Sequence, residues 1–147
     1  EYVPQQGRKA RGIKMWMQLR YFGLSGLRVR LLRHIDLAHE LAGWIDEDPD
    51  AEVLFGVPFG TVCFRMRPRR YAGREGEPVV AQALAALNEA VMNRVNASGR
   101  VFFSHTRIDG VFVLRLVVGN IRQERRHVEQ AWQSVQSAAR ALDGPGE

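Results

Sequence analysis

Histidine is the residue type in this sequence with the widest chemical use, and it occurs four times in 147 residues. His34 and His39 lie five positions apart in a segment that we expect to be helical. They therefore point from different faces, whereas a helical metal pair needs a spacing of four. His105 lies at the end of an expected strand, and His127 lies at the start of an expected helix. We assign all four histidines structural or surface roles and predict no metal site.

Cys63 is the only cysteine, and its neighbours limit its chemistry. A lone cysteine excludes an internal disulfide framework and a multi-cysteine zinc site. A nucleophile set of Cys63, His105 and Asp109 can be drawn, but a cysteine between Val62 and Phe64 is typical of a small core residue. The sequence carries no phosphate-binding glycine loop, nucleophile elbow or paired-carboxylate motif. The residues alone thus indicate a domain without a complete active site.

Arginine dominates the charge of the chain. Of the 21 basic residues 19 are arginine, and with 16 acidic residues the formal net charge is +5. The basic residues gather in two segments, 8–20 and 65–74. A nucleic-acid groove would combine such charges with exposed aromatic residues, whereas Trp16, Tyr21 and Phe22 fall within an otherwise apolar pattern. We expect these charges to face solvent or other protein surfaces, and we expect the acidic turn at 46–50 to be a solvated helix end. The alternative is a non-catalytic basic interaction module, which predicts salt-sensitive binding of nucleic acid.

The spacing of apolar residues predicts the elements that hold these side chains. Residues 7–22 are too apolar for one narrow stripe, so this helix is expected to be buried on more than one side. After a break at 23–26, a second helix is expected to bury Leu27, Leu31, Ile35, Ala38, Ala42 and Ile45. The remaining elements are expected to be strands over 52–57 and 60–67, an exposed loop over 68–78, a helix over 79–96, strands over 101–106 and 111–118, and a helix capped by Asn120 that buries Val128, Trp132, Val135, Ala139 and Leu142. This order predicts an α+β fold in which helices cover a four-stranded, mostly antiparallel sheet.

Six motifs occur in collinear order along nearly the whole chain. They are Gly7-Arg-Lys-Ala-Arg-Gly-Ile-Lys-Met-Trp16, Tyr21-Phe-Gly-Leu-Ser-Gly-Leu27, His34-Ile-Asp-Leu-Ala-His39, Val62-Cys-Phe-Arg65, Asn93-Arg-Val-Asn96 and Val113-Leu-Arg-Leu116. Together they resemble the C-terminal part of group II pyridoxal-phosphate-dependent decarboxylases, most closely the aromatic-L-amino-acid decarboxylases. The resemblance implies the small domain of a fold-type-I enzyme, with residues 1–26 as a connecting segment and helix to a large domain, 27–143 as the small domain and 144–147 as a tail. It also makes Glu1 the expected cut edge of a longer protein.

The resemblance implies a cofactor and an activity that this chain supplies only in part. Pyridoxal 5'-phosphate provides an electron sink for the loss of carbon dioxide from an amino acid. In the family, the Schiff-base lysine, the aspartate at the ring nitrogen, the histidine stacked on the ring and the catalytic tyrosine all lie upstream of this region. Lys9, Lys14 and Tyr2 are therefore not expected to take these roles, no catalytic residue is expected in the chain, and the chain alone should be inert.

One turn of the chain is nevertheless expected to reach the active site. In the family, the segment matching Gln6, Gly7 and Arg8 crosses the dimer towards the neighbouring subunit's pocket, near the cofactor phosphate and the substrate ring. Glycine at position 7 would leave room for a large aromatic substrate. Arg115 can be compared with the carboxylate-binding arginine of fold-type-I aminotransferases. A decarboxylase gains nothing by clamping the departing carboxylate, so we expect Arg115 to form a structural ion pair.

The resulting expectation is a cytoplasmic homodimer that converts aromatic L-amino acids to amines and carbon dioxide, and whose partners are its own large domain, a second subunit and the amino acid. Nucleic acid is not an expected partner, because the basic residues are expected to face solvent or other protein surfaces. A membrane is not expected either, because the longest apolar run, 111–118, contains Arg115 and is far shorter than the ~20 residues of a membrane span. Two alternatives share the fold: action on another amino acid, and aldehyde synthesis by oxidative decarboxylation.

Overall fold

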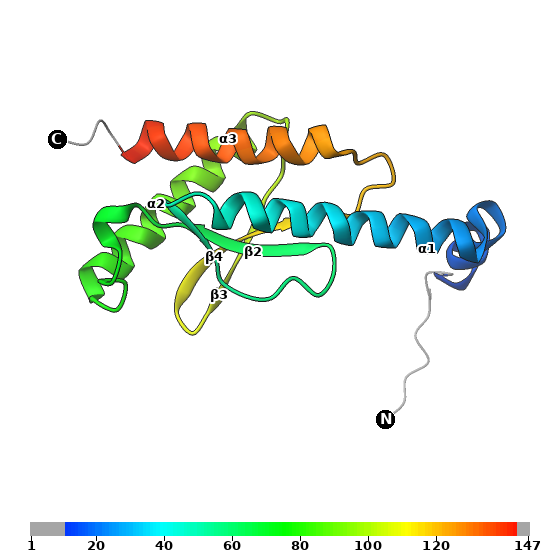
Figure 1. Ribbon diagram of the computed structural model, residues 1–147, viewed down its shortest axis with the longest axis horizontal. Helices are drawn as coiled ribbons and strands as arrows, with labels where there is room; N and C mark the ends of the chain where they lie inside the picture. Colours follow the sequence, from blue (N-terminus) through cyan, green and yellow to red (C-terminus); the bar gives the residue numbers. More distant parts are fainter. Residues whose placement is uncertain (1–10, 144–147) are drawn as a thin grey trace, which may run out of the picture.

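The computed structural model describes residues 11–143, which form three α-helices and a four-stranded sheet (Figure 1). The elements in chain order are α1 (Arg11–Asp46), β1 (Ala51–Val53), β2 (Thr61–Met66), the 3-10 turn η1 (Arg69–Tyr71), α2 (Pro78–Ala97), β3 (Ser104–Ile108), β4 (Val111–Val117) and α3 (Arg125–Asp143). This arrangement confirms the predicted α+β fold. None of the described helices is long and apolar enough to span a membrane.

The sheet has the strand order β1-β2-β4-β3, and every neighbouring pair is antiparallel. Alternation along the strands directs Val62 and Phe64 of β2 into the core beside their β4 partners, Leu116 and Leu114. The same core contains buried residues from all three helices, and α1 and α3 lie side by side in Figure 1. The helices therefore cover one face of the sheet. The opposite face, defined by Cys63 and Arg115, is only partly covered and is called the open face below.

Two asparagines on α2 replace missing strand neighbours. The fully buried Asn88 side chain accepts a hydrogen bond from the Met66 backbone N–H at 2.7 Å and donates to the Met66 carbonyl at 2.9 Å. About two helical turns further on, Asn96 makes the same two contacts with the backbone of Phe103, at 2.7 and 2.9 Å. Because a buried backbone group without a partner is costly, each amide joins the helix to the sheet at a point where strand pairing has ended.

These contacts explain why the strand bounds differ from the prediction. The strand expected over 101–106 is observed at Ser104–Ile108, because Asn96 holds both backbone groups of Phe103 that a strand partner would otherwise bind. The strand expected over 52–57 ends at Val53, and the Val57 carbonyl lies 2.7 Å from Nε2 of His39 on α1. Helix positions were predicted more closely, because the spacing of apolar residues marks a helix over several turns.

The predicted cap of the last helix was wrong. Asn120 lies in the turn before α3, where its side-chain oxygen accepts a hydrogen bond from the Arg122 backbone N–H at 2.9 Å. The helix itself begins at Arg125, and it buries Val128, Trp132, Val135 and Ala139 as expected. Leu142, expected on the same face, is 39% exposed because it lies in the last turn of the helix. Leu31, expected on the buried face of the second helix, is 62% exposed, because α1 extends past the edge of the sheet there.

The exposed loop expected over 68–78 is held in place by ion pairs at three points. Arg70 binds Asp143 at the end of α3, Arg74 binds Glu77 at 2.8 Å, and Glu75 lies 3.1 Å from Arg67 of the sheet. The pKa of Glu75 is lowered, chiefly by its own backbone N–H and with help from the guanidinium of Arg67. The loop is thus largely exposed, as predicted, but it has one defined conformation.

Candidate functional site

The predicted pocket turn of Gln6, Gly7 and Arg8 lies outside the described residues, as does Lys9. What the structure does describe is the helix that follows this turn, and the surface from which that helix projects. The position of the turn in an active site therefore remains a prediction, and the geometry below concerns the residues that would hold it.

The residues with reactive side chains are not brought together. Cys63 lies on the open face of β2, whereas His105 is on β3, separated from β2 by β4, and its ring stacks on Phe112 at 4.7 Å. Asp109 occupies the β3–β4 turn. Within residues 11–143, no three histidine, cysteine, aspartate or glutamate side chains are placed to hold a metal ion. Cys63 is half-buried on this face and is not part of the hydrophobic core, so the core position expected for it was wrong.

Arg115 differs from its prediction. It lies on the open face opposite Cys63, is exposed, and donates a hydrogen bond from Nε to the Ser104 hydroxyl at 3.1 Å. Among the described residues it has no acidic partner, so the structural ion pair expected for it is not found there. The guanidinium is instead held by Ser104 of the neighbouring strand β3 and is exposed on the open face of the sheet.

The ion pairs of the open face lie one strand away, at the β1–β2 edge. Glu52 binds Arg65, and its second oxygen lies 3.2 Å from Nε of Arg67, without hydrogen-bond geometry. Glu75 contacts Arg67 from the loop. Two cations and two anions therefore neutralise each other. Sequence reasoning missed this cluster because the partners are 8 to 15 residues apart along the chain, and only the strand register and the path of the loop bring them together.

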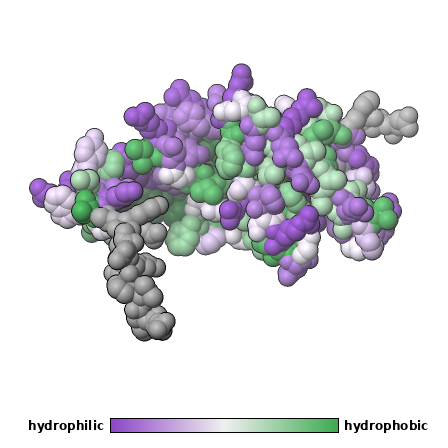
Figure 2. All heavy atoms as spheres, turned by 180° about the vertical axis from the view of Figure 1, so that it is seen from behind, coloured by the Kyte–Doolittle hydropathy of each residue, from purple (hydrophilic) through white to green (hydrophobic). Residues whose placement is uncertain are grey.

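The first part of α1 carries several exposed large apolar side chains close together. We call residues 12–22, which precede the break at Gly23, the arm. Five large apolar side chains project from it and are between 37% and 64% exposed: Ile13, Met15, Trp16, Met17 and Leu19. At 100° per residue they occupy a continuous arc of roughly 200°, with Lys14 and Gln18 on the other side. Figure 2 shows hydrophobic atoms at this end of the molecule, beside the grey N-terminal residues.

The prediction that this helix is buried on more than one side is therefore wrong for the described chain. Its side chains are apolar on more than one side, as the sequence indicates, but the residues described here do not cover them. Exposed apolar patches of this extent mark sites of interaction with another protein surface. The arm is thus the strongest candidate for a functional contact in the described structure.

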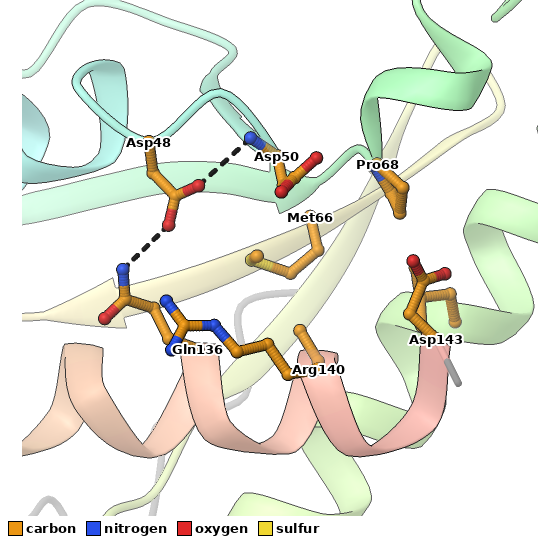
Figure 3. Close-up of a pocket in the computed structure, with 9 residues that line it drawn as sticks. Asp48, Asp50, Met66, Pro68, Gln136, Arg140 and Asp143 are labelled. Atoms are coloured by element: carbon orange, nitrogen blue, oxygen red, sulfur yellow. Dashed lines mark hydrogen bonds between the residues drawn. The ribbon is translucent and has the colours of Figure 1, made fainter. Parts of the chain in front are cut away.

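A small cavity lies between the end of α1, the sheet and α3 (Figure 3). It holds about 60 Å³ and is bordered by Asp48, Asp50, Gln136 and Asp143, among others. Asp48 accepts hydrogen bonds from the Gln136 amide at 2.7 Å and the Asp50 backbone N–H at 3.0 Å, while Asp50 accepts one from the Arg69 N–H at 2.9 Å. Ligand pockets typically hold several hundred Å³, so this cavity is too small for an amino acid or a cofactor.

The described residues do not fit pyridoxal phosphate by themselves. The sequence contains two lysines, and the one that the structure describes, Lys14, is exposed on the arm rather than beside an enclosed pocket. A cofactor held through a lysine would need both a pocket and an amine within it. No step of a cofactor-dependent reaction is therefore assigned to residues 11–143.

Comparison with known proteins gives the chain its relatives. A family model described as "Pyridoxal-dependent decarboxylase conserved domain" matches residues 2–67. The aromatic-L-amino-acid decarboxylase of Sus scrofa is 33% identical over 136 residues, which are 92% of this chain and 25% of that protein. The phenylacetaldehyde synthase of Arabidopsis thaliana is 34% identical over 136 residues, 92% of this chain and 26% of that protein.

The fold has a counterpart in solved structures. The crystal structure of Oryza sativa TDC with PLP and tryptamine matches with a TM-score of 0.77 and 32% identity, over 90% of this chain and 27% of that one. The chain thus spans about a quarter of the length of the relatives that it matches. Both the sequence and the arrangement of helices on the sheet agree with one region of those proteins.

Proposed function

We propose that the chain belongs to the pyridoxal-dependent decarboxylase family and that it is the C-terminal small domain of a cytoplasmic, homodimeric enzyme that converts aromatic L-amino acids to amines and carbon dioxide. Residues 1–26 would connect it to a large domain, 27–143 would form the small domain, and 144–147 a tail. The observation that carries this proposal is the arm, whose exposed apolar arc calls for a protein surface that the described chain does not contain.

In this proposal the large domain holds pyridoxal phosphate and its lysine. The small domain contributes surfaces: the arm packs against the large domain, and the turn of Gln6, Gly7 and Arg8 completes the pocket across the dimer. The open face of the sheet, with Arg115 exposed on it, is the second surface available to the rest of the enzyme. We expect the isolated chain to be inert, because its described lysine, Lys14, is exposed on the arm rather than held inside a pocket.

The experiment is an assay of carbon dioxide release from L-DOPA, L-tryptophan and L-phenylalanine. It compares the 147-residue chain with the longer protein that includes the upstream region. We expect no release by the chain alone and release by the longer protein. An inactive longer protein, shown to be folded by circular dichroism and tested on glutamate and histidine as well, would refute the decarboxylase assignment.

A second candidate reaction is aldehyde synthesis, because a phenylacetaldehyde synthase is as similar to this chain as the decarboxylase is. The two reactions differ in their products. The same assay therefore measures amine and aldehyde separately, and aldehyde with consumption of oxygen would replace the decarboxylase assignment with the synthase.

Replacing Gly7 by serine in the longer protein is expected to change relative activities towards the three aromatic substrates, with the largest loss for tryptophan. A side chain at this position would shrink the proposed pocket, and one misfitting group in such a pocket alters discrimination by about 10- to 200-fold. The measurement is kcat/KM for each substrate. Gly43→Ser serves as the control, because Gly43 lies on α1 outside the arm, is exposed, and a Cβ there would meet no described atom within 4 Å. Equal changes for all substrates in the Gly7 variant would contradict the pocket role.

A further inference from the structure

The arm meets the rest of the chain at a single backbone break. Gly23 has φ 67° and ψ 168° in the middle of α1, a combination that is essentially restricted to glycine. Figure 1 shows the first turns of α1 directed away from the axis of the following helix. Because glycine also adopts many other backbone conformations at little cost, Gly23 permits this bend but does not fix its angle.

One side chain crosses the break. The half-buried Arg30 lies two turns beyond Gly23, and its guanidinium carbon is 4.4 Å from the centre of the Phe22 ring, the last residue of the arm. The same guanidinium donates a hydrogen bond from Nη1 to the Ile121 carbonyl at 3.0 Å, in the turn that follows β4. Among the side-chain hydrogen bonds, ion pairs and ring contacts of residues 11–143, this bridge alone joins the arm to the part of the chain after Gly23.

We propose that Arg30 is a positioning residue that sets the angle of the arm, because its guanidinium links the Phe22 ring to the carbonyl of Ile121. The planar guanidinium suits this position, because its face can stack on an aromatic ring while its edge donates to a carbonyl. The inference rests on the proposed function in one respect: a fixed arm would place the turn of Gln6, Gly7 and Arg8 reproducibly at a neighbouring active site.

The test measures the angle directly on the 147-residue chain. Spin labels are attached to cysteines introduced at the exposed Gln18 on the arm and the exposed Gln133 on α3, in a Cys63→Ala background, and the distance between them is measured by pulsed electron spin resonance. Arg30→Met removes the guanidinium and keeps an apolar stem. Arg30→Lys keeps a cation and a donor. Arg33→Met is the matched control, because Arg33 is exposed on the same helix and makes no side-chain hydrogen bond or ion pair with a described residue.

We expect one narrow distance distribution for the parent and for Arg33→Met. Arg30→Met should broaden the distribution and shift its mean, Arg30→Lys should partly restore it, and the unfolding temperature should stay unchanged, because neither arginine lies in the core. A distribution for Arg30→Met that matches the parent would overturn the proposal, as would equal broadening by Arg33→Met. These readings need neither cofactor nor substrate, so they stand whether or not the proposed enzyme activity is found.

A second readout applies to the longer protein. If the arm carries the pocket turn, Arg30→Met should lower kcat/KM by about tenfold, since a misplacement on the order of 1 Å can cost up to about a hundredfold. Arg33→Met should retain the parent value, and Arg30→Lys should fall between them. A broadened distance distribution with an unchanged kcat/KM would keep the bracing role of Arg30 and remove the link to the active site.

Discussion

Replacement of Asn88 by leucine is expected to lower the free energy of unfolding of the chain by about 3–5 kcal/mol. The Met66 N–H and carbonyl would remain buried without partners, which costs about 1–3 kcal/mol for each group. The misfit of the branched side chain adds to this cost. The amide is fully buried and makes three hydrogen bonds, two to Met66 and one to the Leu84 carbonyl at 2.8 Å. Leucine is similar in size, so the effect reports the lost hydrogen bonds rather than a cavity. Urea denaturation followed by circular dichroism measures it.

Asn93→Leu is the matched control for this substitution. Asn93 lies on the same helix, is exposed and makes no side-chain hydrogen bond with a described residue, so its replacement should change the free energy of unfolding by less than about 0.5 kcal/mol. Equal effects of the two substitutions would show that helix propensity, and not the link between α2 and β2, determines the stability of this region.

Replacement of Trp16 by glutamate is expected to destabilise the longer protein by about 2–4 kcal/mol and to leave the isolated chain nearly unchanged. Trp16 is 60% exposed and lies in the middle of the apolar arc of the arm, so it contributes little to the core of this chain. In the proposed enzyme the same side chain would be buried against the large domain, where a charge without a partner is expensive. Urea denaturation of both proteins measures the two effects.

Gln18→Glu controls for the introduced charge, because Gln18 lies on the polar side of the same arm and is exposed. It should leave both proteins within about 0.5 kcal/mol of their parents. A loss of stability in the isolated chain carrying Trp16→Glu would mean that the tryptophan packs on this chain. Unchanged stability of the longer protein would mean that the arm does not contact the large domain.

The helices and the antiparallel character of the sheet could be predicted from the sequence, because they depend on local spacing and on short connections between strands. Val80, Leu84, Val91 and Val95 recur at helical intervals, and all four are buried on α2. Strand ends were less accurate, since they depend on contacts distant along the chain. The backbone of Phe103, just before β3, is bound by Asn96, and the carbonyl of Val57, after β1, lies beside His39; neither contact can be read from the spacing of residues in the sequence.

The functional surface was predictable only in part, for a similar reason. An excess of apolar residues at 13–22 indicated a helix with more than one contact face, but sequence spacing cannot tell whether the contacting surface belongs to the same chain. The contacts of Arg30 could not be predicted, because Ile121 is 91 residues away along the chain and Phe22 lies on the other side of the break at Gly23. The pocket turn was inferred from family resemblance, and its residues lie outside the described range.

The most direct measurement of the central claim is the visible absorption of bound pyridoxal phosphate, recorded after gel filtration, for the 147-residue chain and for the longer protein that contains it. We expect no bound cofactor on the chain alone, because Lys14, the lysine that the structure describes, is exposed on the arm and lies outside the cavity between α1, the sheet and α3. We expect a Schiff-base band on the longer protein that disappears on reduction with borohydride. A cofactor band on the isolated chain, or a folded longer protein that elutes without one, would contradict the account.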